Sequence, residues 1–312
     1  AAKWYFEKYT AKTKCTFTNF ACRNAKLYTA ARIGNLNTFD AIIVGPGGLI
    51  LPDSSPNKVS CWQWVVSKDL YAKITVPIHV MAIGWNLFYG QTIDMPRRQS
   101  CGSDKSRTPI FRANMQALLN RASSFTMRHK ADITKLLSVV GAEYSSRIQW
   151  AECPTMPYAR ALWRDKASKA VAVEIKTDRE NVRFRAGGGK GKVYAALFQV
   201  IRRLLKMGEK VVHLSHDGSV NFLRYCVLRD LKLPSLRNDV ADAGKIRKNY
   251  KSFDIIICTA GHSQMISHAL GKLTIGLNTH PKTKAFCHDN NTPLVELKRI
   301  SDIPKIVSAH RS

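Results

Sequence analysis

The feature that most constrains this chain is an alternation of short apolar runs with amphipathic, helix-like segments. Two such runs are FDAIIVGPGGLIL at 39–51 and VPIHVMAIGWN at 76–86. Apolar residues at helical spacing occur between these runs, in VSCWQWVVSKDLYAKI at 59–74. They occur again after the second run, in FRANMQALLNRASSF at 111–125 and in the later part of TMRHKADITKLLSVVG at 126–141. Apolar strands that alternate with helices predict βαβ units and a parallel sheet.

The alternation stops around AECPTMPYARALWRDKAS (151–168), where Pro154 and Pro157 break the pattern, and then starts again. Later runs that predict strands are KAVAVEIKTD, KVVHLSHDG, FDIIICTAG and KLTIGLN; predicted helices between them include YAALFQVIRRLLKMG and SVNFLRYCVLRDL. We therefore predict an α/β protein of two doubly wound, Rossmann-like domains, 1–155 and 156–312. Ligands of such sheets bind beyond the carboxyl ends of the strands.

The charge of the chain indicates an anionic partner. Lys and Arg number 49 against 22 Asp and Glu, a net charge of +27, and both halves share the excess. So large a charge exceeds what a small anionic substrate requires. It favours nucleic acid, an acidic membrane surface, or phosphorylated or acidic-glycan substrates.

Other features suggest where the protein works. No apolar run approaches the roughly 20 residues that span a bilayer, so we expect a soluble protein. The chain begins with Ala1 instead of Met, which suggests processing or a fragment. None of the eight cysteines forms a CxxC pair or a metal-like quartet, which favours free thiols in a reducing compartment and predicts no metal site. The compartment would be cytoplasmic or, if the positive charge and a processed start are taken together, mitochondrial.

Two glycine-rich stretches have weak functional signals. AGGGKGKV departs from the phosphate-binding P-loop pattern at both ends, where Ala186 and Val193 replace the required Gly and Ser or Thr. We interpret it as a flexible basic loop that could still touch phosphates. VGPGGL at 44–49 lacks the GxGxxG spacing and is typical of a tight turn after a strand.

Two histidines and a cluster of three arginines are the candidates for chemistry. His262 and His280 follow two successive predicted strands, at ends that would share one sheet edge. Arg179, Arg183 and Arg185 cluster after the VAVEI run, and guanidinium groups suit carboxylates and phosphates. A satisfied core histidine and a solvated basic loop remain open as structural interpretations of the same residues.

Taken together, several segments resemble the polysaccharide pyruvyl transferase family, from about Asp40 onward. They are DAIIVGPGG, IHVMAIGWNLFYGQ, SSFTMRHKADITKLL, AECPTM, VHLSHDG and, above all, CTAGHSQMISHALGKLTIGLNTHPKTKAF. The family has a strand, an Arg-x-His turn, a helix, a strand and a His-x-Lys segment that ends in an aromatic residue. Here His262, His280, Lys282 and Phe286 occupy those places.

The resemblance implies a GT-B-like fold and transfer of the enolpyruvyl group of phosphoenolpyruvate to sugar hydroxyls, without a cofactor. His262 would then be the catalytic histidine. Arg179, Arg183, His280 and Lys282 would bind the carboxylate and phosphate of the donor.

The chain departs from the family at two places. Ala260 stands where the family has the Arg of Arg-x-His, and a methyl group cannot hold an anion. If that Arg binds the donor, its loss costs about 1.5–3 kcal/mol, the value of a charged hydrogen bond. The first unit also begins with the helix-like AKWYFEKYTAK instead of the family's first strand.

These departures leave a second interpretation, a non-catalytic homologue that binds RNA as a structural subunit of a ribonucleoprotein such as a mitochondrial ribosome. Phosphate contacts would come from exposed basic residues: Arg183, Arg185, Lys190, Lys192, Arg247, Lys248, Lys251, Lys282 and Lys284. Fold-level kinship does not carry activity with it, so both interpretations stay open here.

Overall fold

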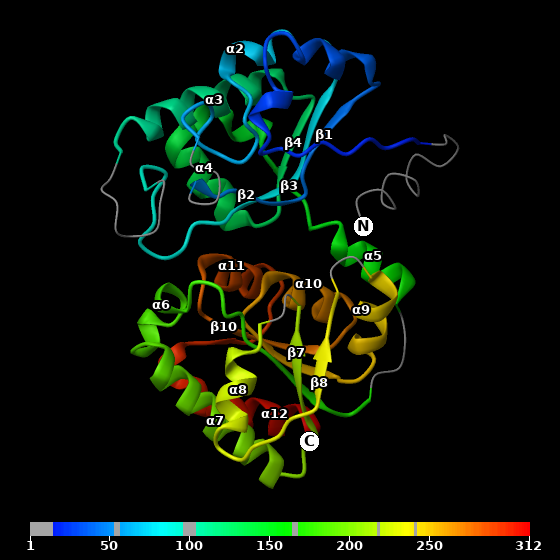
Figure 1. Ribbon diagram of the computed structural model, residues 1–312, viewed down its shortest axis with the longest axis vertical. Helices are drawn as coiled ribbons and strands as arrows, with labels where there is room; N and C mark the ends of the chain where they lie inside the picture. Colours follow the sequence, from blue (N-terminus) through cyan, green and yellow to red (C-terminus); the bar gives the residue numbers. More distant parts are fainter. Residues whose placement is uncertain (1–14, 53–56, 96–103, 164–167, 217–218, 240–241) are drawn as a thin grey trace. The chain divides into compact units, whose positions relative to one another are not determined.

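The computed structural model describes residues 15–52, 57–95, 104–163, 168–216, 219–239 and 242–312 (Figure 1). The helix predicted at the front of the chain lies outside these ranges. The chain divides into two compact units, Ala1–Pro154 and Thr155–Ser312, and each contains one parallel sheet with helices around it. The predicted α/β class with two Rossmann-like sheets is therefore confirmed.

The sheet of the first unit is centred on its longest strand, β3 (Ile78–Trp85), which pairs in parallel with three neighbours. The other strands are β1 (Ile42–Val44), β2 (Gly47–Ile50), β4 (Ser124–Met127) and β5 (Gln149–Trp150). The helical segments are η1 (Ala25–Leu27), η2 (Ile33–Thr38), α2 (Lys68–Tyr71), α3 (Arg107–Arg121), α4 (Lys130–Val140) and η4 (Ala142–Arg147).

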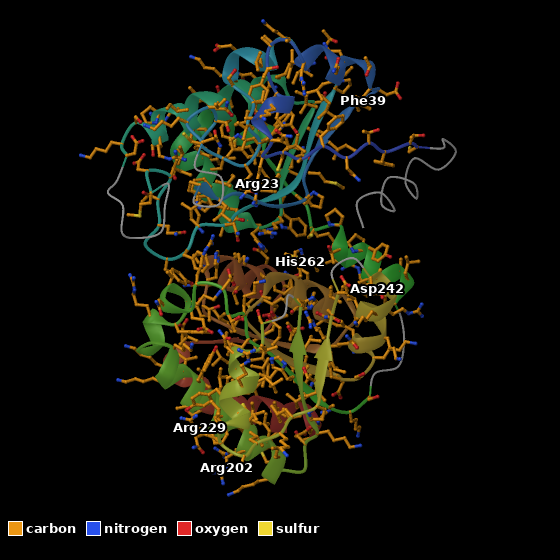
Figure 2. All side chains as sticks on the ribbon, in the orientation of Figure 1. Arg23, Phe39, Arg202, Arg229, Asp242 and His262 are labelled. Atoms are coloured by element: carbon orange, nitrogen blue, oxygen red, sulfur yellow. The ribbon has the colours of Figure 1, made fainter. Side chains whose placement is uncertain are left out.

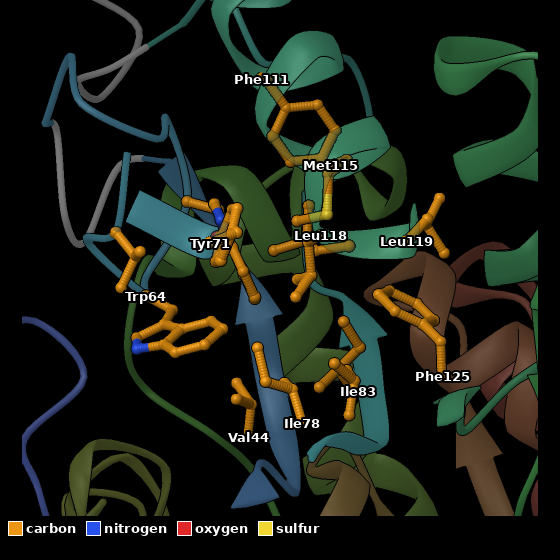
Figure 3. Close-up of a cluster of buried hydrophobic side chains, with 14 of the residues drawn as sticks. Val44, Trp64, Tyr71, Ile78, Ile83, Phe111, Met115, Leu118, Leu119 and Phe125 are labelled. Carbon is orange, nitrogen blue, oxygen red and sulfur yellow. The ribbon is translucent and has the colours of Figure 1, made fainter. Parts of the chain in front are cut away.

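The core of the first unit lies between this sheet and α3. Figure 3 shows Met115 and Leu118 of α3 above Ile83 of β3, and all three side chains are buried. Aromatic rings extend the same cluster on one side, where Trp64 and Tyr71 lie with their ring centres 5.5 Å apart. Burial of these large side chains is the main stabilising contribution within the unit.

The long helix predicted at 59–74 is wrong, because only α2 is helical there. Its aromatic residues are instead held in irregular backbone by Asn114 of α3. The Asn114 side-chain oxygen accepts hydrogen bonds from Trp62 Nε1 and Tyr71 OH, both at 3.0 Å, and its amide donates to the Val66 carbonyl at 2.7 Å. Buried tertiary contacts have overridden the helical spacing.

The run at 39–51, predicted as a strand that ends in a tight glycine turn, forms β1 and then a second strand, β2, that begins at Gly47. Gly45 separates them with φ +123°, and a Cβ at this position would lie 2.2 Å from the Met81 carbonyl oxygen. Only glycine fits a backbone that approaches a neighbouring strand so closely.

The second unit has six parallel strands in the order β11-β10-β9-β6-β7-β8. Their bounds are β6 (Val171–Glu174), β7 (Val211–Ser215), β8 (Ser235–Arg237), β9 (Ile255–Cys258), β10 (Leu273–Leu277) and β11 (Leu294–Val295). Along the chain, β7 and β8 are added in turn on one side of β6. The chain then crosses to the other side of β6, where β9, β10 and β11 are added in turn. The boundary between β6 and β9 is thus a topological switch point, where doubly wound sheets bind ligands.

Helices surround this sheet (Figure 1). They are α5 (Thr155–Leu162), α6 (Glu180–Arg183), α7 (Lys190–Lys206), α8 (Asn221–Val227), α9 (Ala243–Tyr250), α10 (Gly261–Ala269), α11 (Pro281–Asp289) and α12 (Ile303–Arg311), with η5 (Arg185–Gly187) and η6 (Leu297–Asp302). The amphipathic pattern predicted α7 correctly: Val193, Leu197, Ile201 and Leu204 are buried at helical spacing. In the described residues, no helix is both long and apolar enough to cross a membrane.

We expect Ile257→Ala to destabilise the second unit strongly. Ile257 lies in the middle of β9 and is completely buried, so the change leaves a cavity worth about 2–5 kcal/mol in the free energy of unfolding. Urea denaturation followed by circular dichroism measures it. The exposed Val227→Ala is the matched control and should change stability by less than about 0.5 kcal/mol; equal effects of the two would contradict this account of the core.

Candidate functional site

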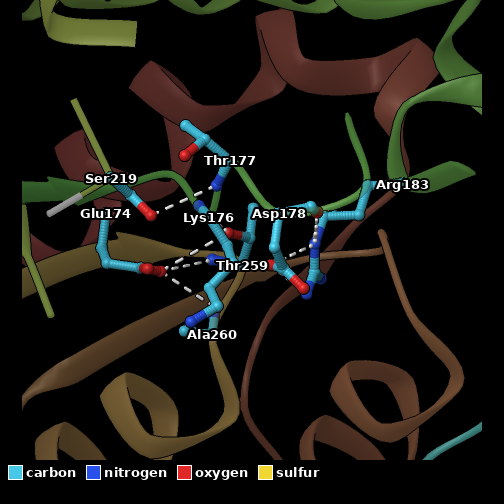
Figure 4. A network of polar contacts seen from close by, with 8 residues as sticks. All are labelled: Glu174, Lys176, Thr177, Asp178, Arg183, Ser219, Thr259 and Ala260. Carbon is cyan, nitrogen blue, oxygen red and sulfur yellow. Dashed lines mark hydrogen bonds and ion pairs between the residues drawn. The ribbon is translucent and has the colours of Figure 1, made fainter. Parts of the chain in front are cut away.

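A buried carboxyl group marks the switch point of the second unit. Glu174, the last residue of β6, accepts hydrogen bonds at Oε2 from the amides of Thr259 and Ala260, at 3.1 and 2.9 Å (Figure 4). The Lys176 amide donates to Thr259 Oγ1 at 2.7 Å. These bonds join the segments that follow β6 and β9 and thereby fix where α10 begins.

The environment of Glu174 favours its neutral form. Burial raises the pKa of the Glu174 carboxyl, and the amides of Ala260 and Thr259 only partly oppose this effect. The second oxygen, Oε1, is buried without a hydrogen-bond partner in the part of the chain that the structure describes. Glu174 is therefore an acid of raised pKa beneath the start of α10.

His262 and Lys282 lie at the starts of the two helices that follow β9 and β10. His262 is the second residue of α10 and is exposed; Lys282 is the second residue of α11 and is half-buried. The Lys282 side chain lies against Gly261, where an added Cβ would be 3.7 Å from Lys282 Cε. The motif histidine and the motif lysine thus follow adjacent parallel strands, β9 and β10, at their carboxyl ends.

His280 has a different environment from His262. It is completely buried, and its Nδ1 accepts a hydrogen bond from the Lys282 amide at 3.1 Å, which caps α11. A ring nitrogen that accepts a hydrogen bond carries no proton, so this imidazole is neutral. In this geometry His280 orients Lys282 and contributes no positive charge of its own.

The structure corrects the exposed position predicted for Arg183. Its guanidinium is buried and directed back onto its own loop, with Nη2 2.8 Å from Asp178 Oδ1 and Nε 2.9 Å from the Asp178 carbonyl oxygen (Figure 4). Arg179 is half-buried and precedes α6 in a left-handed conformation with φ +56°. Sequence spacing cannot reveal that an arginine is engaged by an acid five residues away.

The glycine-rich loop is also anchored by an acidic residue. Lys190 Nζ lies 2.8 Å from Glu180 Oε2, and Asn221 and Tyr194 hydrogen-bond Glu180 Oε1. Of the remaining predicted phosphate-binding residues, Arg247 is half-buried, and the others are exposed: Arg185, Lys192, Lys248, Lys251 and Lys284. The structure does not gather them into one site with His262.

The first unit contains a polar cluster that sequence reasoning did not select. Arg128 and His129 follow β4 at its carboxyl end, and both are buried. The Arg128 side chain lies flat over Gly84 of β3, where an added Cβ would be 2.3 Å from Arg128 Nε. The sequence feature that could have indicated this cluster is the polar run RHKAD at 128–132, directly after an apolar strand.

This cluster has unsatisfied polar atoms. Arg128 Nε is buried without a hydrogen-bond partner among the described residues, and so is Asp132 Oδ1. Asp132 Oδ2 accepts from the Trp85 amide at 3.0 Å, and burial raises the pKa of Asp132 although His129 and Arg128 oppose the rise. A buried guanidinium next to the first turn of α4 suits an anion.

No metal site is found in the described ranges, where no group of three or more His, Cys, Asp or Glu side chains could hold an ion. Seven cysteines there are free thiols.

Comparison with known proteins supports the fold. No family model and no curated protein sequence matches the chain. Among solved structures, the UDP-GlcNAc 2-epimerase of Methanocaldococcus jannaschii, in complex with UDP-GlcNAc and UDP, matches with a TM-score of 0.51 and 12% identity over 98% of this chain and 80% of its own. A putative UDP-N-acetylglucosamine 2-epimerase from Listeria monocytogenes matches with a TM-score of 0.53 and 10% identity over 99% and 78%.

Likenesses at such low identity establish the fold alone. The chain is therefore an α/β protein with the GT-B-like fold of these sugar-nucleotide epimerases. The comparisons support neither pyruvyl transfer nor RNA binding in particular.

The raised pKa of Glu174 predicts how stability depends on pH. The folded state holds this proton to higher pH than the unfolded chain does, so Glu174 makes stability fall as pH rises above about 4.5, the unfolded value. Glu174→Gln keeps an oxygen that can accept from both amides but cannot ionise. We expect the variant to lose this pH-dependent fall and to be more stable than the unchanged chain at about pH 8.

Thermal unfolding between about pH 5 and pH 8 measures this difference. Glu143→Gln, which changes an exposed carboxylate, is the control and should leave the profile as it is. Parallel profiles for the unchanged chain and Glu174→Gln would show that Glu174 is ionised throughout.

Proposed function

We propose that this protein forms a pyruvate ketal on a sugar with phosphoenolpyruvate as the donor, as a pyruvyl transferase-like enzyme. The observation that carries the proposal is that Lys282, at the start of α11, lies against Gly261, the residue before His262 at the start of α10, beside the switch point. A cation next to a histidine suits a substrate that carries anionic groups and needs proton transfer.

Three features favour an anion at this edge. Lys282 supplies a full positive charge, held in place by the cap that His280 makes. The first turns of α10 and α11 add the partial positive charge of helix N-termini. Burial raises the pKa of Glu174, so this carboxyl group places less negative charge below the same edge than an exposed one would.

The proposed reaction proceeds in two steps at C2 of the donor. A sugar hydroxyl adds to C2 of the enolpyruvyl group while a proton goes to C3, which turns the CH2 group into CH3. A second hydroxyl of the same sugar then attacks C2, and the bond to phosphate breaks with its electron pair remaining on the phosphate. His262 is the group that delivers the proton to C3 and takes one from the attacking hydroxyl.

Ala260 limits this function. It is the N-cap of α10, and its amide donates a hydrogen bond to Glu174. It precedes His262 by two residues, where the family has the Arg of Arg-x-His. Without that guanidinium, Lys282 must hold the donor with less help. We therefore propose weak donor binding in the unchanged chain.

RNA binding is the second candidate, and the net charge of +27 favours it. The geometry is less favourable, because Arg183 and Lys190 are already paired with Asp178 and Glu180. The pyruvyl transferase-like function therefore ranks first.

We expect Lys282→Gln to weaken phosphoenolpyruvate binding by about tenfold to a hundredfold, since a charged hydrogen bond is worth about 1.5–3 kcal/mol. Isothermal titration calorimetry measures the change. Lys284→Gln removes an exposed lysine from the same helix and should bind like the unchanged chain. Equal affinity in all three proteins would remove Lys282 from the donor site.

His262→Gln should act on turnover more than on binding. Loss of a positioned acid–base group slows a reaction by about 10²–10⁴-fold. Phosphate release from phosphoenolpyruvate, measured across a panel of sugar acceptors, reports it. Undiminished release by His262→Gln would contradict the assigned role, and no sugar-dependent release by the unchanged chain would count against the proposed reaction itself.

Restoring the missing guanidinium should strengthen binding. Ala260→Arg is expected to raise the affinity for phosphoenolpyruvate by at least about tenfold, through one added charged hydrogen bond. Ala195→Arg adds the same charge at an exposed position of α7 and serves as the control. A gain of the same size in both variants would mean that only net charge matters.

A further inference from the structure

A surface at the ends of α7 and α8 combines exposed aliphatic side chains with arginines. Leu228, which ends α8, is 81% exposed, and Val227 beside it is also exposed. Leu205 and Met207 are exposed at the end of α7. Single apolar side chains are normal on protein surfaces, but here the ends of two contacting helices each carry two exposed ones.

Basic side chains accompany these apolar ones. Arg202 and Arg229 lie near each other in Figure 2, at the end of the unit that holds the chain's C-terminus in Figure 1. The other exposed cations of the two helix ends are Arg203, Lys206, Arg224 and Lys232. We name Leu205, Met207, Val227, Leu228 and these six cations the basic-apolar patch.

Few acids offset the charge of the patch. Asp230 is exposed next to Arg229. Glu209, after α7, is already paired with Arg311, whose Nε lies 2.9 Å from Glu209 Oε1. The patch therefore has a clear excess of positive charge.

Aromatic rings form a rigid base under the two central arginines. The Arg229 guanidinium lies 3.8 Å from the centre of the Tyr225 ring, and Arg202 lies 6.0 Å from the centre of Phe198. The Phe198 and Tyr225 rings are in turn 6.2 Å apart and edge-on. These cation–π contacts hold the charges between the two helices.

We propose that the basic-apolar patch docks the protein on an anionic lipid surface. Arginines attract acidic headgroups, while leucine, valine and methionine side chains gain free energy by entering the boundary between headgroups and acyl chains. Nucleic-acid phosphates would use the same cations but gain nothing from exposed aliphatic side chains. The combination of the two kinds of side chain favours a membrane over RNA.

The patch is separate from the candidate active site. α7 and α8 each leave the carboxyl edge of the sheet and run back toward the start of the next strand, so their last residues lie at the opposite edge from His262. Substitutions in the patch should therefore leave donor binding and turnover unchanged. The docking proposal does not depend on the proposed reaction.

Vesicle flotation of the full chain tests the proposal. We expect binding to phosphatidylcholine vesicles that contain about 30 mol% phosphatidylglycerol and much weaker binding to phosphatidylcholine alone. Leu205→Ser with Leu228→Ser keeps the charge and should reduce the partition coefficient by at least about tenfold. Arg202→Gln with Arg229→Gln should reduce it by about thirtyfold, at about 1 kcal/mol for each cation.

Matched substitutions elsewhere serve as controls. Val59→Ser and Lys68→Gln change exposed residues of the first unit and should bind the acidic vesicles normally. Filter binding of the same proteins to single-stranded RNA tests the alternative that the patch binds nucleic acid. The proposal is overturned if acidic vesicles are not bound, or if the leucine variant binds them as well as the unchanged chain. RNA binding that falls with the arginine variant alone, without vesicle binding, would identify the patch as a nucleic-acid surface.

Discussion

The pairing of β6 with β9, closed by the Glu174 carboxyl group, is the constraint on which the candidate site depends. Because Glu174 accepts from the Thr259 and Ala260 amides, the start of α10 is fixed relative to the end of β6. That start places His262 at the carboxyl edge, and the adjacent strand β10 places Lys282 against Gly261. A buried acid at this position lowers the stability of the fold as the pH rises toward neutral. The acid nevertheless lies at the switch point, where doubly wound sheets bind ligands.

The large positive charge has several distinct uses. Arg183 and Lys190 hold their own loops through Asp178 and Glu180. Lys282 faces the candidate donor site, and Arg202 and Arg229 belong to the basic-apolar patch at the other edge of the sheet. One composition thus serves local structure and two proposed surfaces, so the net charge alone does not identify a partner.

The periodicity of apolar residues correctly predicted elements whose structure depends on local sequence. It failed where contacts with residues far along the chain determine the backbone conformation. The buried face of α7 and the glycine after it could be read from spacing, as could the strand-to-loop positions of His262 and His280. The segment 59–74 kept a helical pattern yet is irregular, because Asn114, far along the chain, bonds its aromatic residues. Neither Glu174 nor Arg128 could be selected, since each is defined by residues that only folding brings near.

The most direct test of the central claim is a crystal structure of the chain grown with phosphoenolpyruvate. The account predicts density for the ligand at the first turns of α10 and α11, with an anionic group within hydrogen-bond distance, about 2.7–3.2 Å, of Lys282 Nζ and with His262 beside C3. Ligand density elsewhere at full occupancy, for example over Arg128 alone, with the edge between His262 and Lys282 empty, would contradict it.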